Sequence, residues 1–152
     1  MPGQYTGLQR TYKFEGNEAK MFTGLTYGSA DGSAKVPDSD NAKFVGVIVN
    51  DEQMRDPLRG GINIDSSGTI DTVDGRNIAV QVGGYGSIVL DGSADYGDRL
   101  ILADGGKAKK MPDEAGTYNV IGEAQKGGDD EDLIPFNIEP KVVTITEDDF
   151  SE

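Results

Sequence analysis

The stretch that decides the fold is residues 78–111, which opens with Ile78-Ala79-Val80-Gln81-Val82-Gly83-Gly84-Tyr85-Gly86. In its first run, Ile78, Val80 and Val82 alternate with Ala79 and Gln81, the period-two pattern of a strand with one buried face. Two more short apolar runs follow at 87–90 and 98–103, with glycines between the runs. Because glycine adopts a positive φ without steric cost, this spacing favours tight turns. The stretch therefore predicts a β-meander and fits no helix.

The composition of the chain also favours an all-β fold. Of the 152 residues, 22 are glycine, whereas the hydrophobic fraction is 36% and the aromatic fraction 7%. The core material is therefore concentrated in short strands, and the length is that of one domain. Further apolar or alternating runs predict strands near 44–49, 62–64, 70–73, 118–124, 134–138 and 142–145. We expect a small β-barrel or a jelly-roll-like sandwich with an extended N-terminal arm.

Composition shifts divide the sequence into three expected parts. These are an N-terminal arm and linker at 1–41, a β-barrel or sandwich domain at 42–146, and an acidic tail at 147–152. The region from Gly28 to Asn41 is rich in glycine, serine and aspartate, which is typical of a linker or a long exposed loop. The run from Phe44 to Val49 is apolar throughout and predicts a strand that is buried on both faces.

The first 35 residues differ from the rest in charge and in aromatic content. They carry four basic and three acidic side chains, a net charge of +1, which leaves −14 for the remainder of a chain whose total is −13. They also hold five of the eleven Phe and Tyr residues. Such an arm is suited to lie on a partner surface. The alternative is that its aromatics fill the domain's own core as a first hairpin.

The charge and the missing residue types exclude several functions. A net charge of −13 opposes binding to nucleic acid and to anionic membranes, because both need Lys and Arg surfaces. No run approaches the roughly 18 apolar residues of a membrane span, so we expect a soluble protein. Without histidine or cysteine there is no Ser-His-Asp triad, thiol nucleophile, disulfide or His- or Cys-ligated zinc site. Acidic clusters at 91–98 and 129–132 fit no calcium-loop pattern. We expect no catalytic, cofactor or metal site.

Several stretches together resemble one protein family. They are Phe44-Val45-Gly46-Val47-Ile48, residues 78–86, Tyr96-Gly97-Asp98-Arg99-Leu100, Ala103-Asp104-Gly105-Gly106-Lys107-Ala108 and Tyr118-Asn119-Val120-Ile121-Gly122-Glu123-Ala124. They resemble the decoration, or cement, proteins of tailed-bacteriophage capsids, in which a Gly-Asp-x-Leu turn, a Gly-Lys-Ala hairpin and a Val-Ile-Gly-x-Ala strand build a small barrel. The resemblance covers residues 42–140 and consists of turn and core residues. It therefore bears on fold more than on function.

The resemblance implies a structural virion protein. Such a protein binds the major capsid protein on the outer surface of the head, stabilises its lattice, is often a homotrimer and is made in the host cytoplasm. Strong negative charge keeps many copies from associating non-specifically. We expect the aromatic arm to make the capsid contact through Tyr5, Leu8, Tyr12, Phe14 and Phe22.

Two other function classes stay open. A glycan-binding β-sandwich on the virion, used for host attachment, would place Tyr85, Tyr96 or Tyr118 as a sugar platform, although the chain has no tryptophan. Third, Gly68-Thr69-Ile70-Asp71 is similar to the Gly-x-Ile-Asp signature of trimeric deoxyuridine triphosphatases, which are jelly-roll enzymes. The tyrosine that follows in those enzymes and their glycine-rich phosphate-binding tail are missing here.

Overall fold

The computed structural model describes residues 9–16, 18–49, 63–64, 69–71 and 77–146, and it confirms an all-β fold. The only helical segment in this part of the chain is a 3-10 turn, η2 (Asp104–Gly106). No helix among the described residues is long and apolar enough to cross a membrane.

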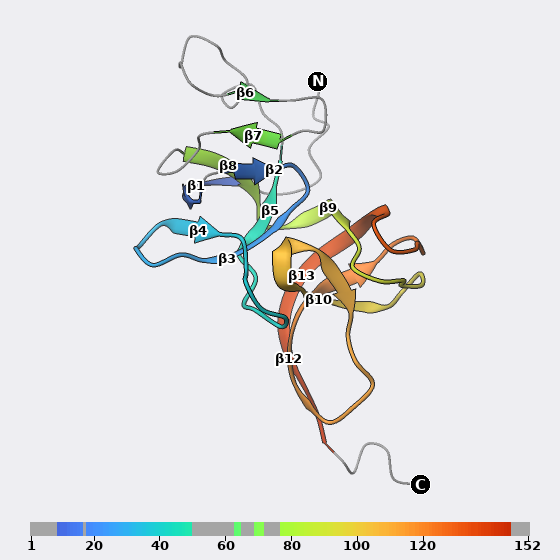
Figure 1. The fold of residues 1–152 in the computed structure, drawn as a ribbon. Coiled ribbons are helices and arrows are strands. Elements are labelled where there is room, and N and C mark those ends of the chain that lie inside the picture. The colour runs from blue at the N-terminus through green and yellow to red at the C-terminus, as the bar shows by residue number, and fades with distance from the viewer. Residues whose placement is uncertain (1–8, 17, 50–62, 65–68, 72–76, 147–152) are drawn as a thin grey trace, which may run out of the picture.

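The first half of the chain forms a closed five-stranded barrel, in the order β1-β4-β3-β5-β8 (Figure 1). Strand β1 closes it, because it pairs in parallel with β4 and antiparallel with β8. The strands are β1 (Gln9–Glu15), β3 (Gly24–Tyr27), β4 (Ser33–Lys35), β5 (Gly46–Ile48) and β8 (Asn77–Gln81). Strands β1, β3 and β4, which lie in the predicted N-terminal arm, are therefore part of the barrel.

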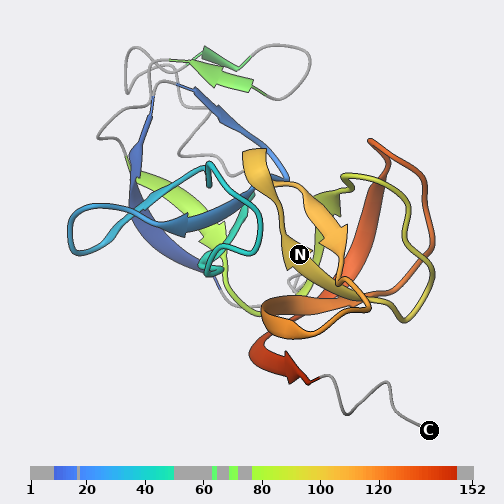
Figure 2. The ribbon, with the colours of Figure 1, turned by 60° about the horizontal axis from the view of Figure 1, so that its bottom comes forward.

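The second half forms a five-stranded sheet in the order β11-β10-β12-β13-β9, which lies beside the barrel (Figure 2). All of its pairs are antiparallel. Its strands are β9 (Gly84–Val89), β10 (Arg99–Leu102), β11 (Ala108–Lys110), β12 (Gly116–Ala124) and β13 (Leu133–Ile145). A small third sheet contains β2 (Glu18–Lys20), β7 (Thr69–Asp71) and β6 (Asn63–Ile64).

The strands predicted around residues 78–103 exist, but the expected meander is wrong. Strand β8 pairs with β1 and β5 in the barrel, whereas β9 pairs with β13 and β10 pairs with β11 and β12. The chain crosses from the barrel to the second sheet at Val82 and Gly83. Gly84 has a φ of 80°, a conformation that favours glycine. The glycines therefore mark a change of sheet instead of a hairpin.

The run 44–48, which ends in β5, was predicted to be buried on both faces, and the structure confirms this. Its side chains enter two hydrophobic clusters, one in the second sheet and one inside the barrel. Phe44 and Val47 pack with the apolar side chains of the second sheet, including Phe136, whose ring meets that of Phe44 edge to face at 6.4 Å. Val45 and Ile48 belong to the separate cluster inside the barrel. All four side chains are at most 8% exposed. The same short run thus contributes to both halves of the molecule.

Two glycines let the barrel and the second sheet approach closely. A Cβ on Gly106, in η2, would lie 2.3 Å from Thr23 Cγ2 and 2.6 Å from the carbonyl oxygen of Gly24. A Cβ on Gly24, in β3, would lie 2.4 Å from Leu102 Cδ1. At Gly106 a backbone oxygen blocks any side chain, whereas at Gly24 the Leu102 methyl group would have to move.

The region predicted as a linker before β5 is bound to the second sheet. The amide of Asn41 donates to the carbonyl of Leu102 at 2.7 Å, and the amide of Gly105 donates to the carbonyl of Pro37 at 2.9 Å. The Asp40 carboxylate accepts from the Asp104 amide at 3.0 Å and from Lys109 Nζ at 3.1 Å. These two donors hold the pKa of Asp40 below its ordinary value, with the Asp104 amide as the larger cause.

Candidate functional site

The acidic loops use their carboxylates to close turns. In the turns 95–98 and 129–132, the amide of the first aspartate donates to the carboxylate of the last at 2.8 Å. The amide of the last aspartate donates back to the carbonyl of the first at 3.0 Å. The third position has a positive φ in both turns, 89° at Gly97 and 72° at Glu131. Two segments far apart in the sequence therefore adopt the same hydrogen-bonded turn.

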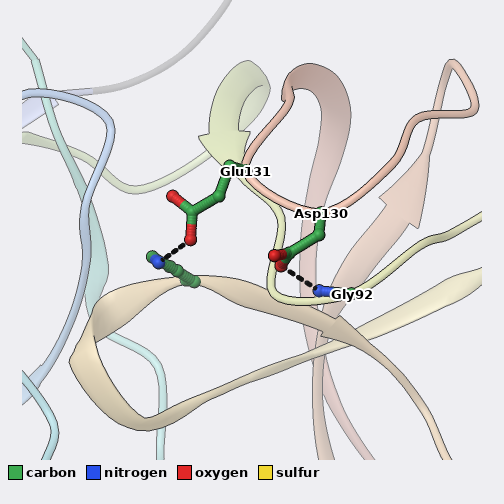
Figure 3. A network of polar contacts seen from close by, with 4 residues as sticks. Gly92, Asp130 and Glu131 are labelled. Atoms are coloured by element: carbon green, nitrogen blue, oxygen red, sulfur yellow. Dashed lines mark hydrogen bonds and ion pairs between the residues drawn. The ribbon is translucent and has the colours of Figure 1, made fainter.

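A second set of contacts ties the acidic loop 129–132 to its surroundings (Figure 3). The amide of Gly92 donates to Asp130 Oδ1 at 2.8 Å, and Lys107 forms an ion pair with Glu131. The Glu131 carboxylate raises the pKa of Lys107. Within the described ranges, no three acidic side chains converge in a way that could hold a metal ion. The carboxylates of Asp130, Glu131 and Asp132 instead form hydrogen bonds or an ion pair within the fold.

Of the residues predicted to contact a capsid, the structure describes Tyr12, Phe14 and Phe22. Phe14 is 1% exposed in the barrel core, and Tyr12 packs half-buried against the same cluster. Phe22 packs half-buried against the other cluster, and its amide donates to the carbonyl of Ile48 at 2.9 Å. Tyr5 and Leu8 lie outside the described residues. For Phe14, the structure favours the alternative that the aromatics of this segment fill the core.

The tyrosines considered for sugar binding differ in exposure. Tyr85 is 59% exposed and Tyr96 is 74% exposed. Tyr118 is 8% exposed, and its hydroxyl donates to the carbonyl of Glu114 at 3.0 Å. Tyr118 is therefore a core residue with a satisfied hydroxyl and cannot act as a platform.

A groove at the junction of the barrel and the second sheet is a candidate binding site. Its volume is about 240 Å³. Barrel strand β3, the entry to β5, and strands β12 and β13 supply its walls. The lining residues are Tyr27, Lys43, Phe44, Asn119, Val120, Pro140, Lys141 and Val142.

The groove is apolar with two cations at its margin. Tyr27 is 60% exposed and Val142 is 66% exposed, so both present apolar surface to solvent. Lys43 and Lys141 are exposed, and within the described chain neither ammonium group has an ion-pair or hydrogen-bond partner. Among the described residues that line the groove, none is acidic. On a chain of net charge −13, it is a locally basic, apolar surface.

The wall formed by β13 is also a free sheet edge among the described strands. Strand β9 pairs with β13 only from Leu133 to Ile138. From Lys141 to Ile145, β13 pairs with β12 on one side only. An edge strand presents unpaired backbone groups to which another chain can bind. The free edge thus belongs to the same strand that supplies one wall of the groove.

The sequence predictions missed this groove. Tyr27, Lys43 and Val142 come from three separate segments, two of which were assigned to the arm and to the barrel entry. The available signal was the apolar run at 142–145, which predicts a strand that contains Val142 but does not show that its side chain is exposed.

Comparison with known proteins finds distant structural likenesses. No family model matches the chain, and no curated protein matches it. Among solved structures, the chain is similar to the N base of the head fiber gp8.5 of bacteriophage phi29, with 14% identity and a TM-score of 0.48. The likeness covers 87% of this chain and 93% of that chain. At this identity and TM-score, it defines neither the fold nor the function of this chain.

Proposed function

We propose that this protein is a structural component of a tailed-phage virion. In this proposal it binds the outer surface of the capsid and stabilises the lattice of the major capsid protein, as a decoration protein does. It carries out no reaction and binds no cofactor, nucleic acid or membrane. It is made in the host cytoplasm and acts as a homo-oligomer, with a trimer favoured.

The observation that carries the proposal is the location of the segments that resemble decoration proteins. Residues 96–100 form the turn into β10, residues 103–108 form the connection from β10 to β11, and residues 118–124 lie in β12. These are adjacent strands of one sheet. Three of the five segments of the resemblance therefore form one continuous piece of structure, whereas residues 44–48 and 78–86 belong to the barrel and to the crossing from β8 to β9.

Individual residues of these segments have the roles that the resemblance requires. Gly97 has a φ of 89°, and Asp98 accepts the amide of Asp95. Leu100, Ile121 and Ala124 are completely buried. The turn residues and the core residues of the resemblance thus occupy turn and core positions.

The test is co-sedimentation of the purified protein with expanded, undecorated heads of its source phage, with the number of bound copies counted per capsid. Saturation at a number set by the icosahedral lattice supports the proposal. Absence of binding by the folded protein contradicts it.

A truncation tests whether the predicted N-terminal contact contributes. Deletion of residues 1–15 is unsuitable, because it removes β1 and Phe14 from the barrel. Deletion of residues 1–8 removes Tyr5 and Leu8 and leaves every described strand in place. If the arm is the capsid contact, this shorter variant stays folded and no longer co-sediments. Full binding would place the contact elsewhere on the protein.

The exposure of Tyr85 and Tyr96 supports glycan binding as a second candidate. Screening the protein against a glycan array tests it. Glycan binding that is lost in Tyr96→Ala or Tyr85→Ala supports this function. The absence of binding to any glycan on the array contradicts it.

A further inference from the structure

We propose that the groove between the barrel and the second sheet binds the acidic segment 147–152 of a neighbouring copy. The segment reads Glu-Asp-Asp-Phe-Ser-Glu and lies outside the described residues. It follows directly on Thr146, the residue after β13. The interaction joins copies to one another and does not depend on a capsid.

The chemistry of the groove matches that of the segment. The groove combines the apolar side chains of Phe44, Pro140 and Val142 with the unpaired ammonium groups of Lys43 and Lys141. The segment combines one aromatic side chain with four carboxylates. Complementary charge steers association and sets register, and a buried aromatic supplies most of the affinity.

The size of the groove fits a phenyl ring. The groove offers about 240 Å³ and is open to solvent, so a phenyl ring would lie against its apolar side chains without being enclosed. With Phe150 inside, Asp148 and Asp149 precede the ring and Glu152 follows it by two residues. Carboxylates therefore flank the ring on both sides, and a lysine lies on each contributing half of the groove, Lys43 before β5 and Lys141 in β13.

Chain length favours a neighbouring copy over the same copy. At roughly 3.3 Å per residue, Thr146 lies about 13 Å beyond Val142 along β13. Phe150 is four residues past Thr146, so its reach is at most about 14 Å. To return to its own groove, the segment would have to reverse at Thr146 and run fully extended. A turn uses about four residues, which leaves none for the return.

An interface of this kind is head-to-tail, because the segment of one copy meets the groove of the next. Such interfaces generate a ring when the rotation between copies closes. In a ring, every groove is filled and every acidic segment is used. This gives the predicted homo-oligomer a specific contact.

The first experiment is sedimentation equilibrium of the full chain without capsids. The intact chain is expected to form a closed oligomer at micromolar concentration. Phe150→Ala is expected to weaken association at least about tenfold, whereas Ser151→Ala, in the same segment, is its matched control and associates normally. Val142→Asp is expected to abolish association.

A mixing experiment distinguishes the proposed contact from other ways of associating. A chain that ends at Thr146 has a groove but no segment, and Val142→Asp has a segment but a damaged groove. Each is expected to be monomeric alone, and together they are expected to form a 1:1 complex. Because Val142 is 66% exposed, Val142→Asp should fold, and Lys141→Glu provides a second groove variant.

Three results would overturn the proposal. They are a monomeric intact chain at all concentrations, unchanged association without residues 147–152, and no complex between the two monomeric variants. A monomer that binds capsids normally would contradict this contact and the proposed homo-oligomer, and would leave the proposed capsid binding standing. Normal self-association without capsid binding would support the contact between copies and contradict the proposed function.

Discussion

Asn41 and Asn119 are joined by two hydrogen bonds that connect the chain entering β5 to strand β12. The amide of Asn119 donates to Asn41 Oδ1 at 2.7 Å, and Asn119 Nδ2 donates to the carbonyl of Asn41 at 2.9 Å. Asn41 Nδ2 also donates to the carbonyl of Thr117 at 2.9 Å. Asn41 has a φ of 66°, a region in which asparagine is tolerated better than most residues. One side chain thus fixes the barrel entry to the second sheet.

Two substitutions of Asn41 test its side-chain hydrogen bonds and its left-handed backbone conformation separately. Asn41→Gly keeps the positive φ and loses two side-chain hydrogen bonds, so we expect the free energy of unfolding to fall by about 1–2 kcal/mol. Asn41→Ala also carries the cost of a left-handed backbone, about 1 kcal/mol more. Urea denaturation measures both. A glycine variant as stable as the parent would show that the bonds to Thr117 and Asn119 add nothing.

Gly105 and Gly106 form a matched pair for testing the close approach of the two halves. Both have a φ of 85°, but a Cβ on Gly105 has open space, whereas one on Gly106 meets Thr23 and the carbonyl of Gly24. We expect Gly105→Ala to cost about 1 kcal/mol. Gly106→Ala is expected to cost about 1–3 kcal/mol more because of overpacking. Equal melting temperatures for the two variants would contradict the tight contact.

Acid should remove part of the stability through Glu15. Its carboxylate accepts from Ser33 Oγ at 2.6 Å, from Ser29 Oγ at 2.9 Å and from the Ser29 amide at 2.7 Å. These bonds, that of Ser33 first, lower the pKa of Glu15. A lowered pKa in the folded state stabilises the protein above the unfolded pKa, about 4.3, and this contribution is lost as the pH falls through the folded pKa.

The measurement for Glu15 compares urea denaturation at pH 7 and pH 3. We expect Glu15→Gln to be less stable than the parent at pH 7, with a smaller difference between the two at pH 3. Asp31→Asn removes an exposed carboxylate from the loop closed by these bonds and serves as the control. A difference between Glu15→Gln and the parent that is the same at both pH values would show that the bonds to Ser29 and Ser33 do not favour the ionised form.

Two N-terminal truncations should behave differently. Strand β1 closes the barrel and contributes Phe14 to its core. Deletion of residues 1–15 is therefore expected to unfold the barrel, whereas deletion of residues 1–8 removes no described strand. Thermal unfolding followed by circular dichroism compares them. A cooperative transition in the longer truncation would mean that the barrel stays closed without β1.

Local patterns predicted the strands and not their partners. The apolar run at 44–49 predicted a strand buried on both faces, and β5 is such a strand. The alternation in β8 also placed Ile78 and Val80 in a core. Periodicity along one strand carries no information on which distant strand lies beside it. The assignment of β8 and β9 to one meander failed for this reason.

Most of the structure that the sequence did not predict lies in polar segments without a strand pattern. Ser33-Ala34-Lys35 is too short to show alternation, yet Ala34 is completely buried in the barrel. Asp40 and Asn41 have the composition of a loop, and their hydrogen bonds to residues more than sixty positions away leave no local signal. The groove was missed in the same way, because Tyr27, Phe44 and Val142 become neighbours only when the barrel and the second sheet meet.

The position of β5 between the two cores has a consequence for cooperativity. Since Val47 faces one hydrophobic cluster and Ile48 the other, neither half can lose its packing without exposing apolar surface of the other. The protein should therefore unfold in a single all-or-none transition, although its strands form separate sheets. A fragment cut between the barrel and the second sheet would leave one core without its wall, so the two halves are inseparable as folding units.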